Sequence, residues 1–221
     1  MVYIYTPDLQ AGELLLDKES AQHIKARRLK PGSEFKLFDG KGLVAIAQII
    51  RIDRRAVEVF VENVSKAPMS SHPRLVIGLT KLPTLEFILQ KSVEVGVGEI
   101  IIIQCDNTPI RFDQQMFSQK HARWEKIVIS ACEQSESLYK PDIHYYGFQE
   151  YISQAKSPVM LHPYANKVAK PCDLNGSDIM IGPEGGFSED EVRCVENTLK
   201  LDCGILRADT AVIAALLYAR L

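Results

Sequence analysis

The stretch Asp178 to Val192 reads D-I-M-I-G-P-E-G-G-F-S-E-D-E-V. Its apolar run at 179–181 is typical of a buried strand. Gly182-Pro183-Glu184-Gly185-Gly186 then interrupts the pattern, and Ser188 with Glu191 forms a capping box that predicts the start of a helix. This order places backbone N–H groups where a ligand can approach without meeting a Cβ. A tight turn that needs positive φ and binds nothing would have the same composition, so both interpretations stay open.

The whole chain has the composition of an ordinary soluble globular protein. It has 221 residues, 46% hydrophobic and 24% charged, enough for one large domain or two modest ones. No apolar run approaches the ~20 residues that span a bilayer, so we expect no membrane partner. The first residues, M-V-Y-I-Y-T-P-D, lack the basic segment of a secretory signal.

Cysteines and histidines give no sign of a disulfide framework or a metal site. The five cysteines are dispersed without a C-x-x-C, and no two of the five histidines are three or four residues apart. This pattern favours reduced thiols in the cytoplasm and predicts no metal.

Residues 1–67 read as a small, mostly β unit. Short strands are expected at 2–5, 13–16, 35–38, 43–52 and 57–61, with a helical segment from Ser20 to about Arg28. Asp39-Gly40-Lys41-Gly42 between two of these strands is a strong hairpin signal. Such a set of short strands with one helix predicts a small barrel or barrel-like sheet.

A basic cluster lies at the end of the predicted helix and in the following turn, and it consists of Lys25, Arg27, Arg28 and Lys30, with Arg54 and Arg55 as further candidates. Residues 1–67 hold 11 Lys/Arg against 9 Asp/Glu, whereas the remainder holds 15 against 19. The cluster is consistent with phosphate contacts, but the residues alone favour a solvated helix end whose cations suit the helix dipole.

From residue 75 onward strands and helices alternate, which predicts a parallel sheet with helices on its faces. A Pro- and Ser-containing linker at 68–74 separates it from the first unit. The expected elements are strands at 75–80, 99–103, 159–161, 179–181 and 203–206, a β–α pair at 143–155, and helices capped by Thr84, from Asp113 to Ser135, from Ser188 to about Lys200, and after Asp209. Loops 161–164, 182–187 and 205–210 then follow carboxyl ends of strands, where ligands gather in such sheets.

Several enzyme classes lose their sequence support. The chain contains no G-x-G-x-x-G, no G-x-x-x-x-G-K-[ST] and no G-x-S-x-G, which are the signatures of dinucleotide-binding enzymes, P-loop NTPases and α/β-hydrolases. His162 is interpreted as a structural or lining residue, and Cys132 as a small core hydrophobe.

The stretch I-L-R-A-D-T-A at 205–211, together with I-G-P-E-G-G-F-S-E-D-E-V, resembles the RsmE family of 16S ribosomal RNA methyltransferases, which methylate uridine at N3. Further stretches fit the same family in order: R-L-K-P-G at 28–32, L-F-D-G at 37–40, L-E-F-I-L-Q-K-S-V-E-V-G-V at 85–97, A-C-E-Q-S at 131–135 and L-H-P at 161–163. The resemblance covers nearly the whole chain.

The resemblance implies a fold, a cofactor and partners. The fold would be a PUA-like RNA-binding β-barrel domain at 1–67, then a SPOUT-type α/β methyltransferase domain at 75–221 with a C-terminal trefoil knot. The cofactor would be S-adenosyl-L-methionine, and the partners would be 16S ribosomal RNA of the small subunit and a second copy in a homodimer. The strand order by itself predicts an unknotted doubly wound sheet.

Site residues follow from the same resemblance. The cofactor-binding residues would be Leu161, His162, Ile181, Gly182, Pro183, Gly185, Gly186, Ile205, Leu206 and Thr210. Candidates for the chemistry at N3 are Arg207, Glu133 and Glu184, because N3 must lose its proton before it attacks the methyl group. The RNA-binding candidates are Lys25, Arg27, Arg28 and Lys30, and with the family in view the phosphate interpretation of this cluster is favoured.

The chain departs from the family pattern at four positions in three stretches. It has Arg207-Ala208-Asp209-Thr210 where R-T-E-T is usual, Ser137 where an arginine is usual, and Thr84 where a lysine is usual. Two further hypotheses therefore stay open: a catalytically weakened RNA-binding protein of the same fold, and an unrelated nucleotide-binding α/β enzyme.

Overall fold

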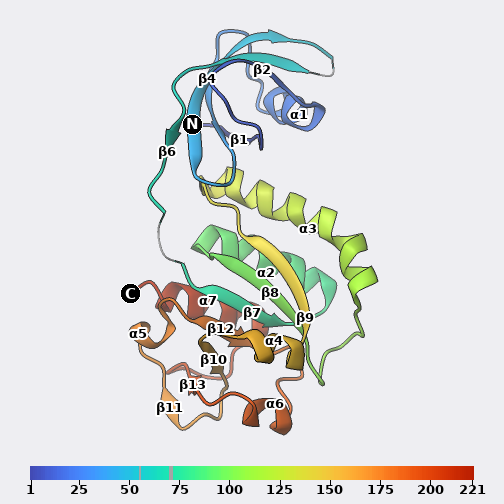
Figure 1. Ribbon diagram of the computed structural model, residues 1–221, viewed down its shortest axis with the longest axis vertical. Coiled ribbons are helices and arrows are strands. Elements are labelled where there is room, and N and C mark those ends of the chain that lie inside the picture. Colours follow the sequence, from blue (N-terminus) through green and yellow to red (C-terminus); the bar gives the residue numbers. More distant parts are fainter. Residues whose placement is uncertain (55, 70–71) are drawn as a thin grey trace. The chain divides into compact units, whose positions relative to one another are not determined.

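The computed structural model describes residues 1–54, 56–69 and 72–221, and the chain forms two compact units (Figure 1). The first comprises Met1–Ser70 and Ile129–Lys140, and the second comprises Ser71–Val128 and Pro141–Leu221. The sequence did not predict that Ile129–Lys140 would belong with the N-terminal residues. Arg55 of the basic cluster and residues 70–71 of the expected linker lie outside the described residues. Within the described ranges, no helix is both long and apolar enough to cross a membrane.

The first unit is a six-stranded sheet with one helix. The sheet order is β1-β3-β4-β5-β2, with β6 paired to β4, and only β1 and β3 run parallel among the pairs found. Its elements are β1 (Tyr3–Tyr5), β2 (Gly12–Leu16), α1 (Lys18–Ala26), β3 (Glu34–Phe38), β4 (Leu43–Ile52), β5 (Val57–Val61) and β6 (Ser65–Lys66).

The β3–β4 hairpin forms where the turn chemistry predicted it. Asp39 Oδ1 accepts hydrogen bonds from Lys41 N at 2.7 Å and Leu43 N at 2.9 Å, and Gly40 and Gly42 both have positive φ. Alternate residues of β3, β4 and β5 then point inward and pack with Ile24 of α1 in one apolar core.

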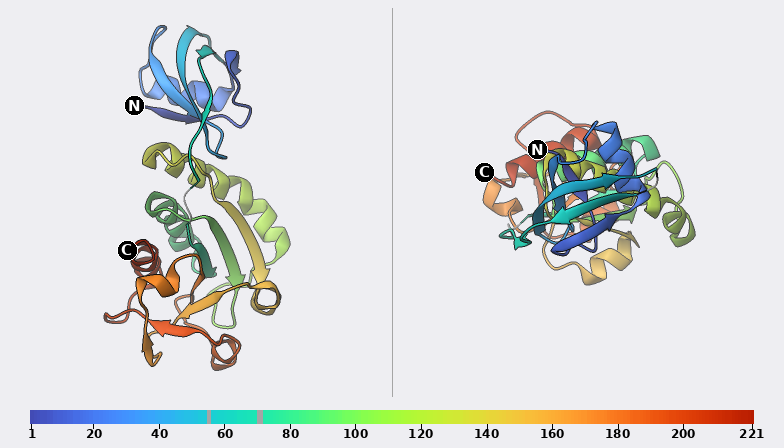
Figure 2. Two further views of the ribbon diagram at one scale, coloured as in Figure 1. Left: turned by 60° about the vertical axis from the view of Figure 1, so that its left-hand side comes forward. Right: turned by 90° about the horizontal axis from the view of Figure 1, so that it is seen from above.

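The second unit is a three-layer α/β structure around a seven-stranded parallel sheet of order β11-β13-β10-β12-β7-β8-β9 (Figures 1 and 2). Its elements are β7 (Arg74–Gly78), α2 (Leu82–Val95), β8 (Glu99–Gln104), α3 (Gln114–Ser135, continuing into the first unit), β9 (Asp142–Gly147), α4 (Phe148–Gln154), β10 (Pro158–Leu161), β11 (Lys167–Val168), α5 (Pro171–Leu174), β12 (Asp178–Ile181), α6 (Glu189–Arg193), β13 (Thr198–Lys200) and α7 (Ala208–Tyr218).

Both faces of this sheet are covered, which explains why its strands are continuously apolar. On one face Val76, Ile101 and Met180 pack with Phe148 of α4 and with Val195 just beyond α6. On the other face α7 packs against α2 and β12. β12 lies between β10 and β7, so the strand that precedes the glycine-rich turn is central in the sheet.

Several predicted elements differ from the structure near the C-terminus. The helix expected to reach Lys200 ends at Arg193, and Thr198–Lys200 forms β13 instead. The strand expected at 203–206 is a loop. Since β13 has only three residues, its pairing with β10 determines its conformation more than any local pattern does.

Three helix starts were also displaced. α1 is capped by Asp17, whose carboxylate accepts from Ser20 N at 2.8 Å, so Ser20 lies inside the helix. α2 begins after Lys81, not at Thr84, because Pro83 suits the first turn of a helix. Arg207, not Asp209, is the N-cap residue of α7.

Candidate functional site

The loops that follow β10, β12 and β13 line one pocket of about 910 Å³ in the second unit. Nine of the ten expected cofactor residues line it: Leu161, His162, Ile181, Gly182, Pro183, Gly185, Gly186, Ile205 and Leu206. Thr210 is the exception, because it is exposed in the first turn of α7 with its hydroxyl 3.4 Å from Asp209 Oδ1. The pocket lies at the carboxyl ends of parallel strands, as expected for a ligand site in such a sheet.

The glycine-rich turn owes its composition partly to the protein's own packing. Gly186 N donates to Pro183 O at 2.9 Å, and Gly186 has a φ of 72°, so the turn needs a residue that tolerates positive φ. A Cβ at Gly185 would lie 2.7 Å from the backbone oxygen of Asn107. The tight-turn interpretation is therefore correct for Gly186. The backbone of the turn at 182–186 nevertheless lines the pocket.

The capping box at Ser188 forms, and its two residues also connect this turn to the loop after β8. Ser188 Oγ accepts from Glu191 N at 3.2 Å, and Glu191 Oε2 accepts from Ser188 N at 2.8 Å. Glu191 Oε1 also accepts from Asp106 N at 3.0 Å, and Ser188 Oγ donates to Asp106 Oδ2 at 2.7 Å. Burial, with Glu191 and Asp106 nearby, raises the pKa of the Cys105 thiol, so this cysteine is protonated and inert.

Charged groups of both signs line the pocket. Glu184 Oε1 accepts from Lys81 N at 3.3 Å, which joins the glycine-rich turn to the start of α2. Arg207 lines the pocket as an exposed side chain at the start of α7, and Asp209 lines it in the same turn. Two of the three expected catalytic candidates, Arg207 and Glu184, are thus brought together with the expected cofactor residues.

Glu133 belongs to the other unit and does not line the pocket. Its Oε1 accepts from Tyr5 N at 3.1 Å, and its Oε2 lies 2.9 Å from His23 Nδ1. These contacts tie the end of α3 to β1 and α1, which is a structural use of this carboxylate. The geometry therefore supports a structural role for Glu133 in the first unit and not the expected role in the chemistry at N3.

Sequence reasoning missed several residues of the pocket wall. They are Lys81, Thr84, Leu201, Cys203, Gly204 and Ala211, whereas Pro163, Tyr164, Phe187, Ala208 and Asp209 belong to the expected site loops 161–164, 182–187 and 205–210. The signal for Lys81 was present, because it follows β7, the neighbour of β12 in the sheet. The residues at 201–204 had no such signal, since the strand before them was misplaced.

The basic cluster of the first unit is exposed, and one of its members has a structural role. Lys25 Nζ donates to Asp53 O at 2.7 Å and Arg54 O at 2.9 Å, so it fastens α1 to the β4–β5 hairpin. Arg27 and Arg28 follow the end of α1, and Arg28 has a positive φ of 56°. The exposed guanidinium groups of Arg27 and Arg28 and the exposed Lys30 ammonium remain accessible to a polyanion.

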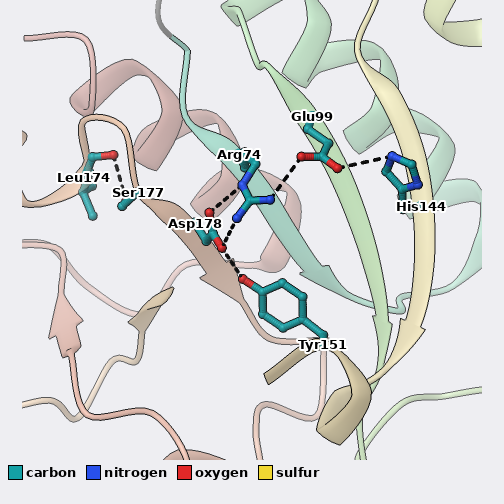
Figure 3. Close-up of polar contacts among 7 residues, drawn as sticks. All are labelled: Arg74, Glu99, His144, Tyr151, Leu174, Ser177 and Asp178. Atoms are coloured by element: carbon teal, nitrogen blue, oxygen red, sulfur yellow. Dashed lines mark hydrogen bonds and ion pairs between the residues drawn. The ribbon is translucent and has the colours of Figure 1, made fainter. Parts of the chain in front are cut away.

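A polar network lies at the amino ends of β7, β8 and β12, whereas the pocket lies at the carboxyl ends of the sheet's strands (Figure 3). Arg74 Nε and Nη2 donate to the two oxygens of Asp178, and Arg74 Nη1 donates to Glu99 Oε2 at 3.3 Å. Tyr151 Oη donates to Asp178 Oδ2 at 2.8 Å, and His144 Nε2 lies 3.2 Å from Glu99 Oε1. Among the described residues, no group of three or more His, Cys, Asp or Glu side chains is arranged to hold a metal ion.

Comparison with known proteins assigns the chain to a family. Residues 67–220 match the family model described as an RNA methyltransferase domain, and residues 16–62 match an RNA methyltransferase PUA domain. Ribosomal RNA small subunit methyltransferase E of Rickettsia conorii is 31% identical over 211 residues, which cover 88% of this chain and 83% of the relative.

Two solved structures extend the likeness to the fold. A protein of Legionella pneumophila assigned as a methyltransferase, solved with its cofactor SAM, is 29% identical and superposes with a TM-score of 0.87 over 97% of this chain and 95% of its own. Ribosomal RNA small subunit methyltransferase E of Neisseria gonorrhoeae, solved with S-adenosyl methionine, is 29% identical with a TM-score of 0.85 over 98% and 95%.

These matches confirm the expected SPOUT-type α/β fold and the PUA-like domain, exclude the hypothesis of an unrelated nucleotide-binding enzyme, and leave the trefoil knot a prediction. The glycine-rich pocket at the strand ends and the sequence similarity along almost the whole chain both point to the same family. The chain belongs to the RNA methyltransferase family that includes ribosomal RNA small subunit methyltransferase E.

Proposed function

We propose that this chain transfers a methyl group from S-adenosylmethionine to N3 of a uridine in the 16S ribosomal RNA of the small subunit. The observation that carries the proposal is the convergence of the loops after β10, β12 and β13 on one pocket. Membership of the RNA methyltransferase family, and the SAM-bound structures within it, support the cofactor and the class of substrate.

The residues present fit this cofactor. The pocket of about 910 Å³ has the size of a site for a nucleoside-sized ligand. Leu161, Ile181 and Leu206 give it an apolar wall suited to an adenine ring, while the turn at 182–186 presents backbone without side chains. When bound, S-adenosylmethionine supplies an electrophilic methyl group on a sulfonium centre.

The chain's own residues then have to promote the loss of the N3 proton. In the reaction the N3–CH3 bond forms, the S–CH3 bond breaks, and the N3 proton leaves for a base or solvent. Negative charge develops on the two uracil carbonyl oxygens, and we assign its stabilisation to the Arg207 guanidinium at the pocket wall. Glu184 is the nearby carboxylate that we assign to orient the base or accept the proton, since it lines the same wall.

We assign the first contact with ribosomal RNA to the PUA-like domain through Arg27, Arg28 and Lys30, with Lys25 holding the helix end in place. The uridine must be unpaired or extruded, because N3 lies on the pairing edge of the base. The chain then works in the cytoplasm, where ribosomal RNA is found.

A homodimer is part of the proposal and rests on α7. This helix, A-D-T-A-V-I-A-A-L-L-Y, is apolar on nearly every side, and a helix with that pattern is normally buried all round. Yet Leu217 is 52% exposed. A second copy covering this side would bury it, and Leu217→Lys should yield a monomer in sedimentation equilibrium.

The test of the function is methyl incorporation. Purified protein and labelled S-adenosylmethionine are incubated with small subunits, and separately with protein-free rRNA, from a strain that lacks the modification. Nucleosides are then identified by mass spectrometry. We expect 3-methyluridine at one position, and Arg207→Ala should reduce its rate at least a hundredfold without loss of S-adenosylhomocysteine binding. Cofactor binding without any methyl transfer would instead favour the catalytically weakened RNA-binding protein.

A further inference from the structure

The outer face of the first unit's sheet has an apolar centre that no other part of the described chain covers. Phe60 of β5 is 48% exposed, and Leu15 of β2 is 68% exposed. Ile46 and Ile50 of β4 are 37% and 44% exposed. Single exposed apolar residues are ordinary, but four on adjacent strands of one sheet face mark an interaction surface.

The strand register places Leu15, Ile46 and Phe60 together, and Ile50 lies at the register shift between Ile49 and Arg51 of β4. Phe60 is opposite Gln48 of β4 and Glu13 of β2, so it sits at the middle of the outer face. Leu15 pairs with Glu58, two residues from Phe60 and on the same side of β5. Ile46 neighbours Glu62, because Glu62 N donates to Ile46 O at 3.0 Å.

Glutamates surround this apolar centre. Glu13, Glu58 and Glu62 are direct neighbours of Phe60 across or along the strands, and Glu34 pairs with Gln48 one strand further on. Of the cations that the register places on this face, Lys36 donates to Tyr3 Oη at 2.8 Å. Arg51 is paired with Asp53 at 3.1 Å and with Glu58 at 3.6 Å. Lys36 stays charged in its contact and is opposite Ile46, so the face is apolar in the middle and, with four glutamates against these two cations, acidic on balance around it.

We propose that this face, defined by Leu15, Ile46, Ile50 and Phe60 with their glutamate rim, docks a lysine- and arginine-rich protein segment of the small ribosomal subunit. The inference rests on the proposed function, which supplies a substrate particle made of RNA and basic proteins. An aromatic anchor inside a charged rim has the anatomy of a protein–protein contact. The acidic rim repels phosphate, so RNA is the wrong occupant and a basic protein is the complementary one.

The acidic face and the basic cluster of the PUA-like domain would bind different components of the small subunit. The cluster at the end of α1 meets RNA, while the opposite sign of charge on the sheet meets protein. An assembled subunit offers both at once, so two moderate contacts combine into tight binding. Protein-free rRNA offers only the first.

The test is a pair of binding measurements on assembled small subunits and on protein-free 16S rRNA. Glu13→Lys/Glu62→Lys should weaken binding to subunits about tenfold and leave binding to protein-free rRNA unchanged or tighter. Phe60→Ser should weaken subunit binding by a similar factor with no effect on rRNA. Glu196→Lys, an exposed charge reversal in the second unit, controls for the general attraction that added lysines have for RNA.

Three results would overturn the proposal. Subunit binding that is unchanged or tighter after Glu13→Lys/Glu62→Lys, relative to the Glu196→Lys control, would mean that the face is free or meets RNA. Loss of self-association in Phe60→Ser by sedimentation would assign the face to a second copy. Wild-type binding that is equal for subunits and protein-free rRNA would exclude any protein contact.

The side chains changed all point away from the core, so unaltered thermal unfolding and unaltered S-adenosylhomocysteine affinity verify the fold of each variant. Failure of the proposed function is recognised separately. In that case the wild-type protein forms no 3-methyluridine, whatever the binding measurements show.

Discussion

Arg74 and Asp178 are 104 residues apart in the chain and form a two-pronged ion pair at the amino ends of adjacent parallel strands (Figure 3). Arg74 Nε donates to Oδ1 at 2.6 Å and Nη2 donates to Oδ2 at 2.5 Å. The Asp178 side chain is 2% exposed. The pair fixes β12 in its central place, and β12 leads directly into the glycine-rich turn.

Removing the arginine should be costly. Arg74→Met leaves the Asp178 carboxylate buried with a single remaining partner, Tyr151, and we expect the free energy of unfolding to fall by about 3 kcal/mol in urea titrations. Arg74→Met/Asp178→Asn should recover at least half of that loss, because no buried charge is then left uncompensated. Equal losses in both variants would show that the ion pair does not hold the strand.

Alkaline stability should depend on Tyr151. Burial raises the pKa of this hydroxyl above its ordinary value of 10, and the hydrogen bond to Asp178 raises it further. Since the unfolded chain releases this proton first, the stabilisation is complete below about pH 10 and is lost as the pH rises above it. Tyr151→Phe should therefore flatten the decline in unfolding free energy between about pH 9 and pH 11. Tyr164→Phe, at a tyrosine that is 76% exposed, should leave the decline as it is in the wild type.

Two glycines of the pocket wall should differ in their tolerance of a side chain. Gly185→Val places a Cβ where Asn107 O lies 2.7 Å away, so the turn must shift and S-adenosylhomocysteine binding should fall more than tenfold by calorimetry. Gly204→Ala is the matched control, because a Cβ there meets nothing within 4 Å. Normal binding by Gly185→Val would mean that the turn at 182–186 does not shape the cofactor site.

The capping box should matter for the same pocket. Glu191→Ala leaves the backbone N–H groups of Ser188 and Asp106 without their carboxylate acceptor, and the loop before α6 should loosen. We expect about tenfold weaker S-adenosylhomocysteine binding. Glu189→Ala removes only an exposed ion pair with Arg193 and should bind as the wild type does, which makes it the control.

The exposed arginine after α1 should contribute to RNA affinity through its charge. Arg28→Ala should lower rRNA affinity and reduce the slope of log affinity against log salt by about 1, with cofactor affinity unaltered. Lys156→Ala, at an exposed lysine of the second unit, provides the comparison. An Arg28→Ala slope equal to that of Lys156→Ala would remove Arg28 from the RNA contact.

Much of the fold was predictable where local chemistry and long-range pairing agree. Asp39 with Gly40 and Gly42 specified the β3–β4 hairpin, and the apolar run at 179–181 specified a buried strand. Prediction was wrong where the two disagree. Thr198–Lys200 follows a short helix without a clear break, and it becomes a strand because β10 offers a parallel edge.

Most of the candidate site was predictable from the arrangement of parallel strands, but the prediction of its residues was incomplete. Parallel strands bring their carboxyl ends to one edge, so Leu161 and Gly182 had to lie near each other. Lys81 was missed because its place at the pocket depends on where α2 begins. The structural use of Glu133 had no sequence signal, since its partners Tyr5 and His23 lie more than a hundred residues away.

The central position of β12 has a consequence for protein synthesis. While the chain is being made, β7 ends at Gly78, long before residues 178–181 emerge, so the β7 edge that will receive β12 lacks that partner over much of translation, whereas β10 ends at Leu161, shortly before β12 begins. The sheet of this unit can therefore be completed only after β12 has emerged. Nascent chains in which this edge is still open should be prone to aggregate and should bind chaperones.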